Sequence, residues 1–270
     1  SGGHGDIRTP SESEDFCGCA GLGILAKRVD GVDEIRKAAR EALRQGAHHL
    51  KIFVSGGIAS PSDPIWMLQF CEDEIRAVVD EAARRRAYVA AHAYTAETIE
   101  RAVRLGVRTI EHGNLIDGKT AKIVAEANAF VVPTLATYEA FHRSGKEEGA
   151  AEHLLKKLDE VRSQGLEAIR LCREAGVKLG FGTDLLGPLH VHQRDEFLLR
   201  SEVESPFEIL NSATAINAEI IGRAGELGTV AEGAFADFLV IDGDPLDDIR
   251  LLAPDSTAIA EVWKNGARVQ

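Results

Sequence analysis

The sequence predicts an α/β fold, namely a (β/α)8 TIM barrel with a small β-sandwich portion at its C-terminal end. Short β-rich runs that end in polar or glycine-rich turns alternate with amphipathic helices along most of the chain. Runs such as "FVVPTL" and "LGFGTD" show little polar alternation, which is typical of parallel strands buried on both faces by right-handed crossovers. About six of the eight strand-helix units of a closed barrel are visible.

The individual elements follow from these periodicities. Strands are expected at His49–Val54, Tyr88–His92, Arg108–His112, Phe130–Thr134 and Lys178–Thr183. Helices are expected at about Gly31–Gln45, Asp73–Arg86, Ala96–Leu105, Lys119–Ala127, Ala150–Ala175 and Pro206–Ile216. Residues 1–227 therefore form the predicted barrel domain.

The pattern changes near Gly228. The segments "GTVAEGAFADFLVIDGDP" and "IAEVWKNGARVQ" have the spacing of short antiparallel strands joined by turns that contain Gly and Asp. Residues 228–270 are therefore expected to form the C-terminal part of a small β-sandwich domain.

Composition excludes several partner classes. The net charge is -12 and the pI is near 5.3, and these values argue against a nucleic acid or an anionic membrane surface as the partner. No apolar run is long enough to span a bilayer. The four cysteines show neither zinc-knuckle spacing nor a dense disulfide pattern, which favours a reducing, cytoplasmic compartment. The chain begins "SGGHGD" without an initiator methionine, so a preceding segment is expected.

Chemistry-bearing side chains stand at the ends of several predicted strands. His92 and His112 close two successive strands, Lys51 lies in "HHLKIFVSGG", and Asp184 ends "LGFGTD". In a barrel of this kind, the carboxyl ends of the strands meet at one shared site, so these side chains are expected to converge. Burial of Lys51 within the run from Leu50 to Val54 would favour the neutral amine. A neutral amine can react with carbon dioxide to give a carbamate, which can bridge two metal ions.

Together these residues resemble a known family. Lys51 in "KIFVSGG", His92 in "HAYT", His112 in "EHG", Asp184 in "GTD" and the tail "GELGTVAEGAFADFLVIDGDPLDDI" look like the amidohydrolase superfamily, close to its imidazolonepropionase-related and Xaa-Pro dipeptidase or carboxypeptidase-like branch. The resemblance implies a carboxylated lysine bridging two zinc ions, histidine ligands, and an aspartate that is both ligand and general base. The expected metal ligands are accordingly Lys51, His92, His112 and Asp184.

One departure from the family pattern bears on completeness. The family's first strand carries an H-x-H pair that this chain lacks, and the pair formed by His190 and His192 follows Asp184 instead. Strand ends at His4, Lys51, His92, His112, Thr134 and Asp184 account for six of eight. The expectation is therefore that a missing N-terminal segment or another copy in a homo-oligomer completes the barrel.

Each candidate residue also has a structural interpretation. A single histidine that closes a strand is commonly a hydrogen-bonded core residue, Lys51 could extend to solvent, and Asp184 could cap the next segment. Tyr94 and Tyr138 are equally compatible with packing and with substrate binding. His4, among glycines, is a candidate site residue, and a loop-level substrate contact is assigned to His192.

The resulting expectation is a zinc-dependent hydrolase that cleaves an amide or peptide bond of a small substrate, such as a dipeptide or N-acyl amino acid. Asp184 would act as general base, and Tyr94 or His4 would stabilise the developing oxyanion. Two alternatives remain at this point. One is hydrolysis of a cyclic amide or deamination by the same residues, and the other is a catalytically silent fragment or binding module.

Overall fold

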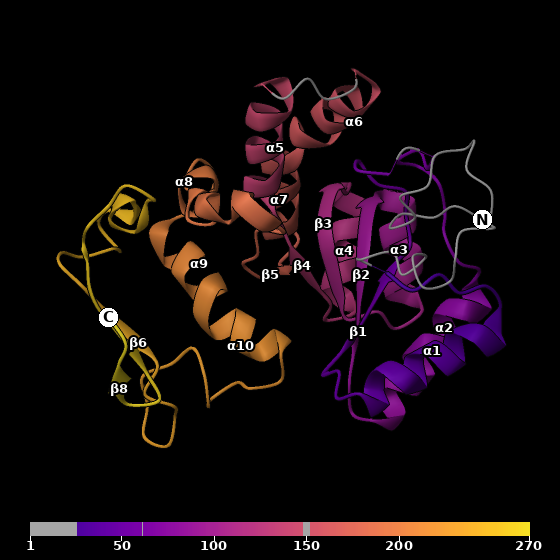
Figure 1. Ribbon diagram of the computed structural model, residues 1–270, viewed down its shortest axis with the longest axis horizontal. Helices are drawn as coiled ribbons and strands as arrows, with labels where there is room; N and C mark the ends of the chain where they lie inside the picture. Colours follow the sequence, from indigo (N-terminus) through magenta and orange to yellow (C-terminus); the bar gives the residue numbers. More distant parts are fainter. Residues whose placement is uncertain (1–25, 61, 148–151) are drawn as a thin grey trace.

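The computed structural model describes residues 26–60, 62–147 and 152–270, and five strands in this part of the chain form one parallel sheet. The strands are β1 (Leu50–Phe53), β2 (Val89–Thr95), β3 (Thr109–Leu115), β4 (Phe130–Val132) and β5 (Lys178–Leu179). They pair in the order of the sequence, and every pair is parallel. The predicted α/β architecture is confirmed, and the described strands form an open sheet with β1 and β5 at its edges (Figure 1).

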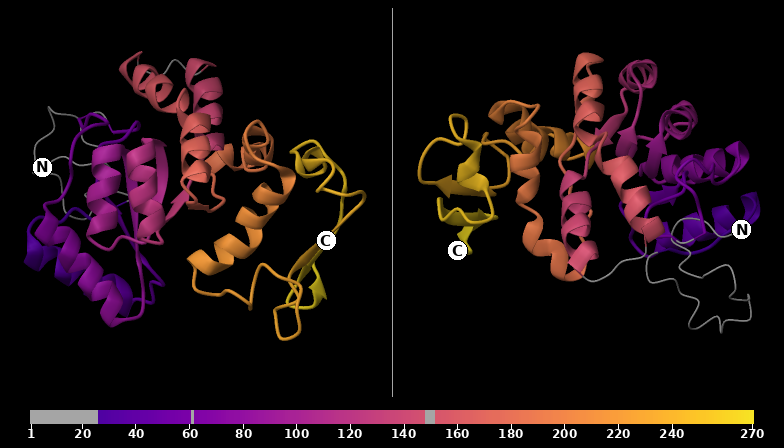
Figure 2. Two further views of the ribbon diagram at one scale, coloured as in Figure 1. Left: turned by 180° about the vertical axis from the view of Figure 1, so that it is seen from behind. Right: turned by 90° about the horizontal axis from the view of Figure 1, so that it is seen from above.

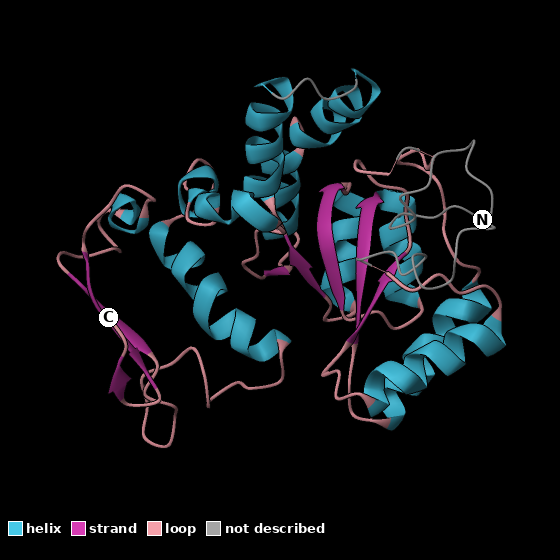
Figure 3. Ribbon diagram, in the orientation of Figure 1, coloured by secondary structure: helices cyan, strands magenta, loops and turns pink. Residues whose placement is uncertain are grey.

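Helices that connect the strands cover one face of this sheet, as Figure 3 shows. They are α1 (Val32–Arg44), α2 (Glu72–Arg84), α3 (Ala96–Arg104), α4 (Gly118–Glu126) and α7 (Gly165–Glu174). The main core lies between these helices and the strands, with Ile75, Ile99 and Ile110 fully buried. Burial of such large aliphatic side chains supplies most of the driving force for this layer.

Two of these helices begin where the preceding strand or loop supplies a cap. Thr95, the last residue of β2, accepts a hydrogen bond from the Thr98 amide at the start of α3. Asp117 accepts one from the Thr120 amide at the start of α4, at 2.7 Å. Because the caps satisfy amides that have no partner within the helix, they fix the point at which each strand turns away from the carboxyl edge of the sheet.

The remaining helices lie at the carboxyl edge and on the far side of the sheet. At this edge, α5 (Leu135–Glu147) and α6 (Glu152–Arg162) form a projecting pair (Figure 1). Across from the uncovered face lie α8 (Asp195–Arg200), α9 (Pro206–Asn211), a π-helical turn at Ser212–Ile216 and α10 (Asn217–Ile220). Between this group and the strands lies a cavity of about 550 Å³.

Two expectations about individual elements were wrong, and one helix was missed. The predicted helix Ala150–Ala175 is two helices, because the chain turns at Ser163 and Gln164 before α7 begins at Gly165. At Gly165 the backbone lies close to Leu135, since an added Cβ would be 2.5 Å from that side chain. The predicted strand to Thr183 ends at Leu179, because the Phe181 amide and carbonyl bond the Asn217 side chain instead of a neighbouring strand. The helix α5 was not predicted.

A small antiparallel sheet forms near the C-terminal end, as predicted. It consists of β6 (Phe238–Ile241), β7 (Ile259–Lys264) and β8 (Ala267–Arg268), and a short 3₁₀ helix (Ile249–Leu252) lies between β6 and β7. The two views of Figure 2 show this sheet set apart from the parallel one. Within the described ranges, no helix combines the length and the apolar character needed to cross a membrane.

Candidate active site at the carboxyl edge of the sheet

Two buried histidines meet at the carboxyl ends of neighbouring strands. His92 on β2 is 2% exposed, His112 on β3 is 4% exposed, and their ring centroids are 4.6 Å apart. The predicted convergence of these two side chains is therefore confirmed. Taken alone, a buried imidazole needs only hydrogen-bond partners, but two in direct contact form a concentrated group of titratable nitrogens.

The local backbone explains how both rings reach the same place. Ala93 pairs with His112 in the register of β2 and β3, so strict alternation would send His92 and His112 to opposite faces. The register shifts after this pair, and His112 and Gly113 adopt φ values of 78° and 70°. A non-glycine residue held at positive φ is strained by one to a few kcal/mol, and such strain is concentrated at functional sites.

Each ring has a second partner that selects its tautomer. The Nε2 of His92 lies 3.1 Å from the Gly56 carbonyl oxygen, which can only accept, so this nitrogen carries the proton. The Nδ1 of His112 lies 2.8 Å from Thr134 Oγ1, which itself donates to the Tyr138 hydroxyl. In the neutral rings, the lone pairs are therefore on Nδ1 of His92 and on Nε2 of His112. This arrangement is typical of histidines that ligate metals, whose other nitrogen is held by a carbonyl or hydroxyl group.

The two candidate tyrosines join the same cluster. Tyr94 and Tyr138 are each 3% exposed, and the Tyr138 hydroxyl donates to the Tyr94 hydroxyl at 3.4 Å. The Tyr94 ring stacks on His112 with centroids 5.2 Å apart. Burial raises the pKa of both phenols well above their usual value, and the negative charge of Asp184 adds to this effect. Both hydroxyls therefore stay protonated at neutral pH and remain hydrogen-bond donors.

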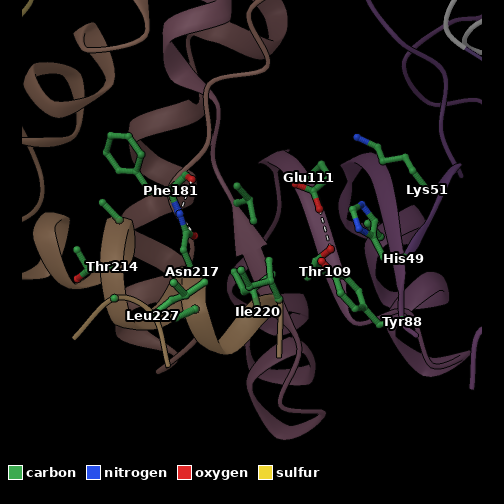
Figure 4. A pocket seen from close by; sticks show the side chains of 16 residues that line it. His49, Lys51, Tyr88, Thr109, Glu111, Phe181, Thr214, Asn217, Ile220 and Leu227 are labelled. Atoms are coloured by element: carbon green, nitrogen blue, oxygen red, sulfur yellow. Dashed lines mark hydrogen bonds between the residues drawn. The ribbon is translucent and has the colours of Figure 1, made fainter. Parts of the chain in front are cut away.

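The predicted burial of Lys51 was wrong. Lys51 is exposed although it belongs to an otherwise apolar strand, because its side chain leaves the uncovered face of the sheet, as Figure 4 shows. The same face presents Glu111, whose carboxylate accepts a hydrogen bond from Thr109 at 2.7 Å. Burial raises the pKa of Glu111, and the positive charge of Lys51 opposes that rise. Lys51 and Glu111 therefore interact electrostatically on this face.

Asp184 lies on the segment that follows β5. Its backbone has φ of 50°, a second non-glycine residue in the left-handed region. Its side chain is exposed, yet the surrounding protein partly desolvates the carboxylate and raises its pKa, while Lys51 lowers it. The negative charge of Asp184 also raises the pKa values of Glu111 and Tyr94, so its carboxylate lies within electrostatic range of both the open side of the sheet and the buried rings.

Two further predicted site residues are not part of this arrangement. His192 lies on the 3₁₀ turn Gly187–His192, where its Nδ1 is 3.2 Å from the Asp195 carboxylate. Asp195 also pairs with Arg143 at 2.9 Å, so His192 belongs to a surface charge cluster beside α5 and α8. His4 lies outside the described residues. The substrate contact assigned to His192 and the role assigned to His4 stay predictions.

Three further residues shape the site and were not predicted from the sequence. Glu111 precedes His112 directly, and its two-residue spacing from Thr109 on a strand predicts that both share a face. Gly56 holds His92 through its carbonyl group, which no sequence pattern reveals. Lys157 on α6 bonds the segment that contains Gly56, across about 100 residues of chain.

The side chains of His92, His112 and Asp184 are of the chemical types that bind divalent transition metals, and the two histidines are in direct contact. Two imidazoles and the Asp184 carboxylate are nitrogen and oxygen groups of the type that zinc prefers. Among the residues described here, however, no group of three or more His, Cys, Asp and Glu side chains is close enough to hold an ion. The described residues therefore supply a ligand pair with oxygen donors nearby.

Known proteins resemble this chain in sequence and in fold. The sequence profile of the amidohydrolase family matches residues 11–269. Ochratoxinase from Aspergillus niger is 30% identical over 278 aligned residues, which cover 98% of this chain and 56% of that protein. The chain thus spans a little over half the length of this curated relative.

Solved structures share the fold. A prolidase complexed with N-methylphosphonate-L-proline is 48% identical with a TM-score of 0.95, over 99% of this chain and 66% of that one. An Xaa-Pro dipeptidase with bound methionine is 29% identical with a TM-score of 0.80, over 90% of this chain and 59% of that one. The profile match spans nearly the whole sequence, and the chain belongs to the amidohydrolase family.

Proposed function

We propose that this chain contributes the catalytic edge of a metal-dependent hydrolase that cleaves an amide or peptide bond in a small substrate. The observation that carries this proposal is the contact between His92 and His112, two buried rings whose tautomers are fixed by Gly56 and Thr134. A core histidine needs no such matched pair at the carboxyl edge of a parallel sheet, where sites of this fold are built. Membership of the amidohydrolase family supports the same reaction class.

The substrate class that we propose is a dipeptide of the Xaa-Pro type or an N-acyl amino acid. Similarity to a prolidase complexed with N-methylphosphonate-L-proline supports the first, and similarity to ochratoxinase supports a wider range of amides. Tyr94 and Tyr138 would contact the substrate, since their hydroxyls remain protonated beside the histidines.

Zinc is the metal that we propose, as a pair of ions held by His92, His112, Asp184 and a carboxylated Lys51. Exposure of Lys51 makes its amine accessible to carbon dioxide, and the resulting carbamate would add an anionic oxygen donor beside Asp184. When bound, the metal would supply Lewis acidity toward the scissile carbonyl and lower the pKa of a water molecule. Residues beyond the described ranges would complete the coordination, because the described set does not form a full cluster.

Asp184 and Tyr94 take the proton and charge roles. Asp184 would accept a proton from the attacking water and return it to the leaving nitrogen, since it is exposed to solvent and its charge acts on Tyr94 of the ring cluster. Tyr94 would donate a hydrogen bond to the carbonyl oxygen of the substrate, on which negative charge develops. The phenol can do so because its raised pKa keeps it protonated.

The experiment is a substrate panel combined with metal analysis. Purified protein is assayed with Xaa-Pro dipeptides, N-acyl amino acids and cyclic ureides, and zinc is measured per chain. Hydrolysis of either of the first two classes, lost in H92A and H112A but kept in H190A, supports the proposal. Turnover of cyclic ureides alone would identify a cyclic-amide hydrolase, and a metal-free, inactive but folded protein would identify a binding module.

A further inference from the structure

Lys157 makes three hydrogen bonds to a segment that is remote in sequence. Its ammonium group on α6 lies 3.0 Å from the Gly57 carbonyl oxygen, 3.0 Å from that of Ser60 and 2.7 Å from that of Asp63. An ammonium group has three hydrogens to donate, and here each of three carbonyls receives one. Because its donor capacity is used in this way, Lys157 is not suited to binding a substrate carboxylate.

The environment of Lys157 raises the importance of these bonds. The side chain is partly buried, and desolvation lowers its pKa, although the nearby negative charge of Asp63 opposes this. A partly desolvated ammonium group needs hydrogen-bond acceptors, and backbone carbonyls serve without adding a second charge. The interaction therefore fixes the backbone of residues 57–60 and 63 against α6.

The same segment holds His92. Gly56, next to Gly57, presents its carbonyl to His92 Nε2, and its amide donates to the Met67 carbonyl oxygen at 3.0 Å. Space at this position is very limited, because a Cβ on Gly56 would lie 1.9 Å from the Pro64 carbonyl oxygen. The backbone near Gly56 is thus fixed from one side by local packing and from the other by Lys157.

We propose that Lys157 is a positioning residue for His92, acting through the backbone from Gly57 to Gly56. By holding this backbone, Lys157 keeps the Gly56 carbonyl where it accepts the Nε2 proton of His92, and so keeps the lone pair on Nδ1. The inference deepens the proposed function and rests on it for its catalytic meaning, whereas the effect on the tautomer of His92 stands on the hydrogen bonds alone.

Nuclear magnetic resonance of the imidazole nitrogens tests this inference without any assay of activity. Long-range proton–nitrogen spectra of uniformly labelled protein are recorded at pH 8.5, where an ordinary imidazole is neutral, and the His92 signals are assigned with H92Q. The unsubstituted chain should show a single Nε2–H tautomer. K157M should show averaging between two tautomers and at least ten-fold faster amide exchange at residues 56–60, because the backbone loses three bonds.

Lys156 provides the matched control, since it is the exposed neighbour of Lys157 on the same helix. K156M should leave both signals unchanged. An unchanged His92 tautomer and unchanged amide exchange in K157M would overturn the proposal. If K157M does not fold, K157R replaces it, because a planar guanidinium group cannot direct three N–H groups toward three carbonyls in the same way. Loss of fold in both variants, but not in K156M, would also overturn it, because Lys157 would then serve folding.

Activity separates this inference from the proposed function. If the chain hydrolyses amides, K157M should lower kcat about ten-fold or more with little change in KM, since the defect lies in the position of His92. If the chain hydrolyses none of the substrates but K157M shows mixed His92 tautomers, the positioning role of Lys157 is sustained and the proposed reaction is excluded. If K157M is active and its His92 signals match those of the unsubstituted chain, the proposed reaction is sustained and the positioning role is excluded.

Discussion

The buried rings and the charged side chains of the candidate site are held in different ways. His92, His112, Tyr94 and Tyr138 are almost inaccessible to solvent, and each has a hydrogen bond to a protein group. Lys51 and Asp184, in contrast, are exposed and influence one another through charge across the uncovered face of the sheet. The imidazole nitrogens are therefore preorganised by hydrogen bonds, whereas the exposed charged groups interact with one another by electrostatics alone among the contacts of the described residues.

This difference separates stability from chemistry. Substitutions among the rings should disturb packing as well as any reaction, because buried groups lose contacts and leave unpaired polar atoms. Substitutions among the exposed charges should alter chemistry while leaving the fold intact.

Asp184→Asn should produce the largest effect, confined to chemistry. The amide keeps the shape but cannot accept a proton, so kcat/KM for the substrate found in the panel should fall about 10³-fold or more, equivalent to about 4 kcal/mol. Because the pKa of Asp184 is raised in the folded protein, the ionised group does not stabilise the fold at neutral pH. The melting temperature should therefore stay equal or rise slightly.

Steady-state kinetics and thermal unfolding check this prediction, with the exposed Asp255→Asn as the control. Near-normal turnover in Asp184→Asn would remove Asp184 from the mechanism. A large fall in melting temperature would instead show that Asp184 stabilises the fold, as the buried rings do.

His112→Ala should affect stability as well as chemistry. Its ring contacts His92 and Tyr94 and donates to Thr134, so truncation leaves a cavity and removes the N–H group from which the Thr134 hydroxyl accepts a hydrogen bond. The free energy of unfolding should fall by about 3 kcal/mol. Urea unfolding measures this loss, with the exposed His190→Ala as control. Equal stability of the two variants would show that the ring cluster is not a packed unit.

The sequence predicted the strand ends better than the contacts between them. Hydrophobic periodicity and composition predicted the positions of β1 to β4. The contact between His92 and His112 was predicted because the carboxyl ends of parallel strands lie at one edge of the sheet. The same reasoning missed the exposure of Lys51, since a single apolar run does not show whether the second face of its strand is covered. It also missed α5, Gly56 and Lys157, because their roles depend on contacts between segments far apart in the chain.

Glu196 links the buried region to pH. This fully buried residue of α8 accepts a hydrogen bond from the Ala136 amide in the first turn of α5, the helix that carries Tyr138. Burial raises its pKa to about 8, opposed by the Arg200 guanidinium. Its second carboxyl oxygen has no hydrogen-bond partner among the residues that the structure describes. The folded state therefore favours the protonated acid.

The sign of the pH effect follows from these pKa values. Between the ordinary pKa of glutamate and about 8, the folded state binds more protons than the unfolded state, so stability falls as pH rises. Glu196→Gln imitates the neutral acid and should flatten this decline between pH 5 and 9. Urea unfolding across that range measures it, with Glu232→Gln as the exposed control. Parallel stability curves for the two variants would contradict a raised pKa for Glu196.

Tyr138→Phe should have the smallest effect, and it tests whether the hydroxyl groups or the rings hold the buried region together. The substitution keeps the ring that packs near His112 and Tyr94 but removes the hydroxyl group between Thr134 and Tyr94. Both bonds are 3.4 Å long and therefore weak, so the free energy of unfolding should fall by only about 1 kcal/mol. Tyr88→Phe, on the cavity face, serves as control. In the unsubstituted chain, the Thr134 hydroxyl donates to Tyr138 and accepts from His112. Without the Tyr138 hydroxyl, Thr134 can donate to His112 instead. The imidazole nitrogen spectrum should then show two tautomers of His112 and still a single tautomer of His92. A mixed His92 tautomer in Tyr138→Phe would contradict this division, because it would mean that the two rings are oriented by one shared network and not by Gly56 and Thr134 separately.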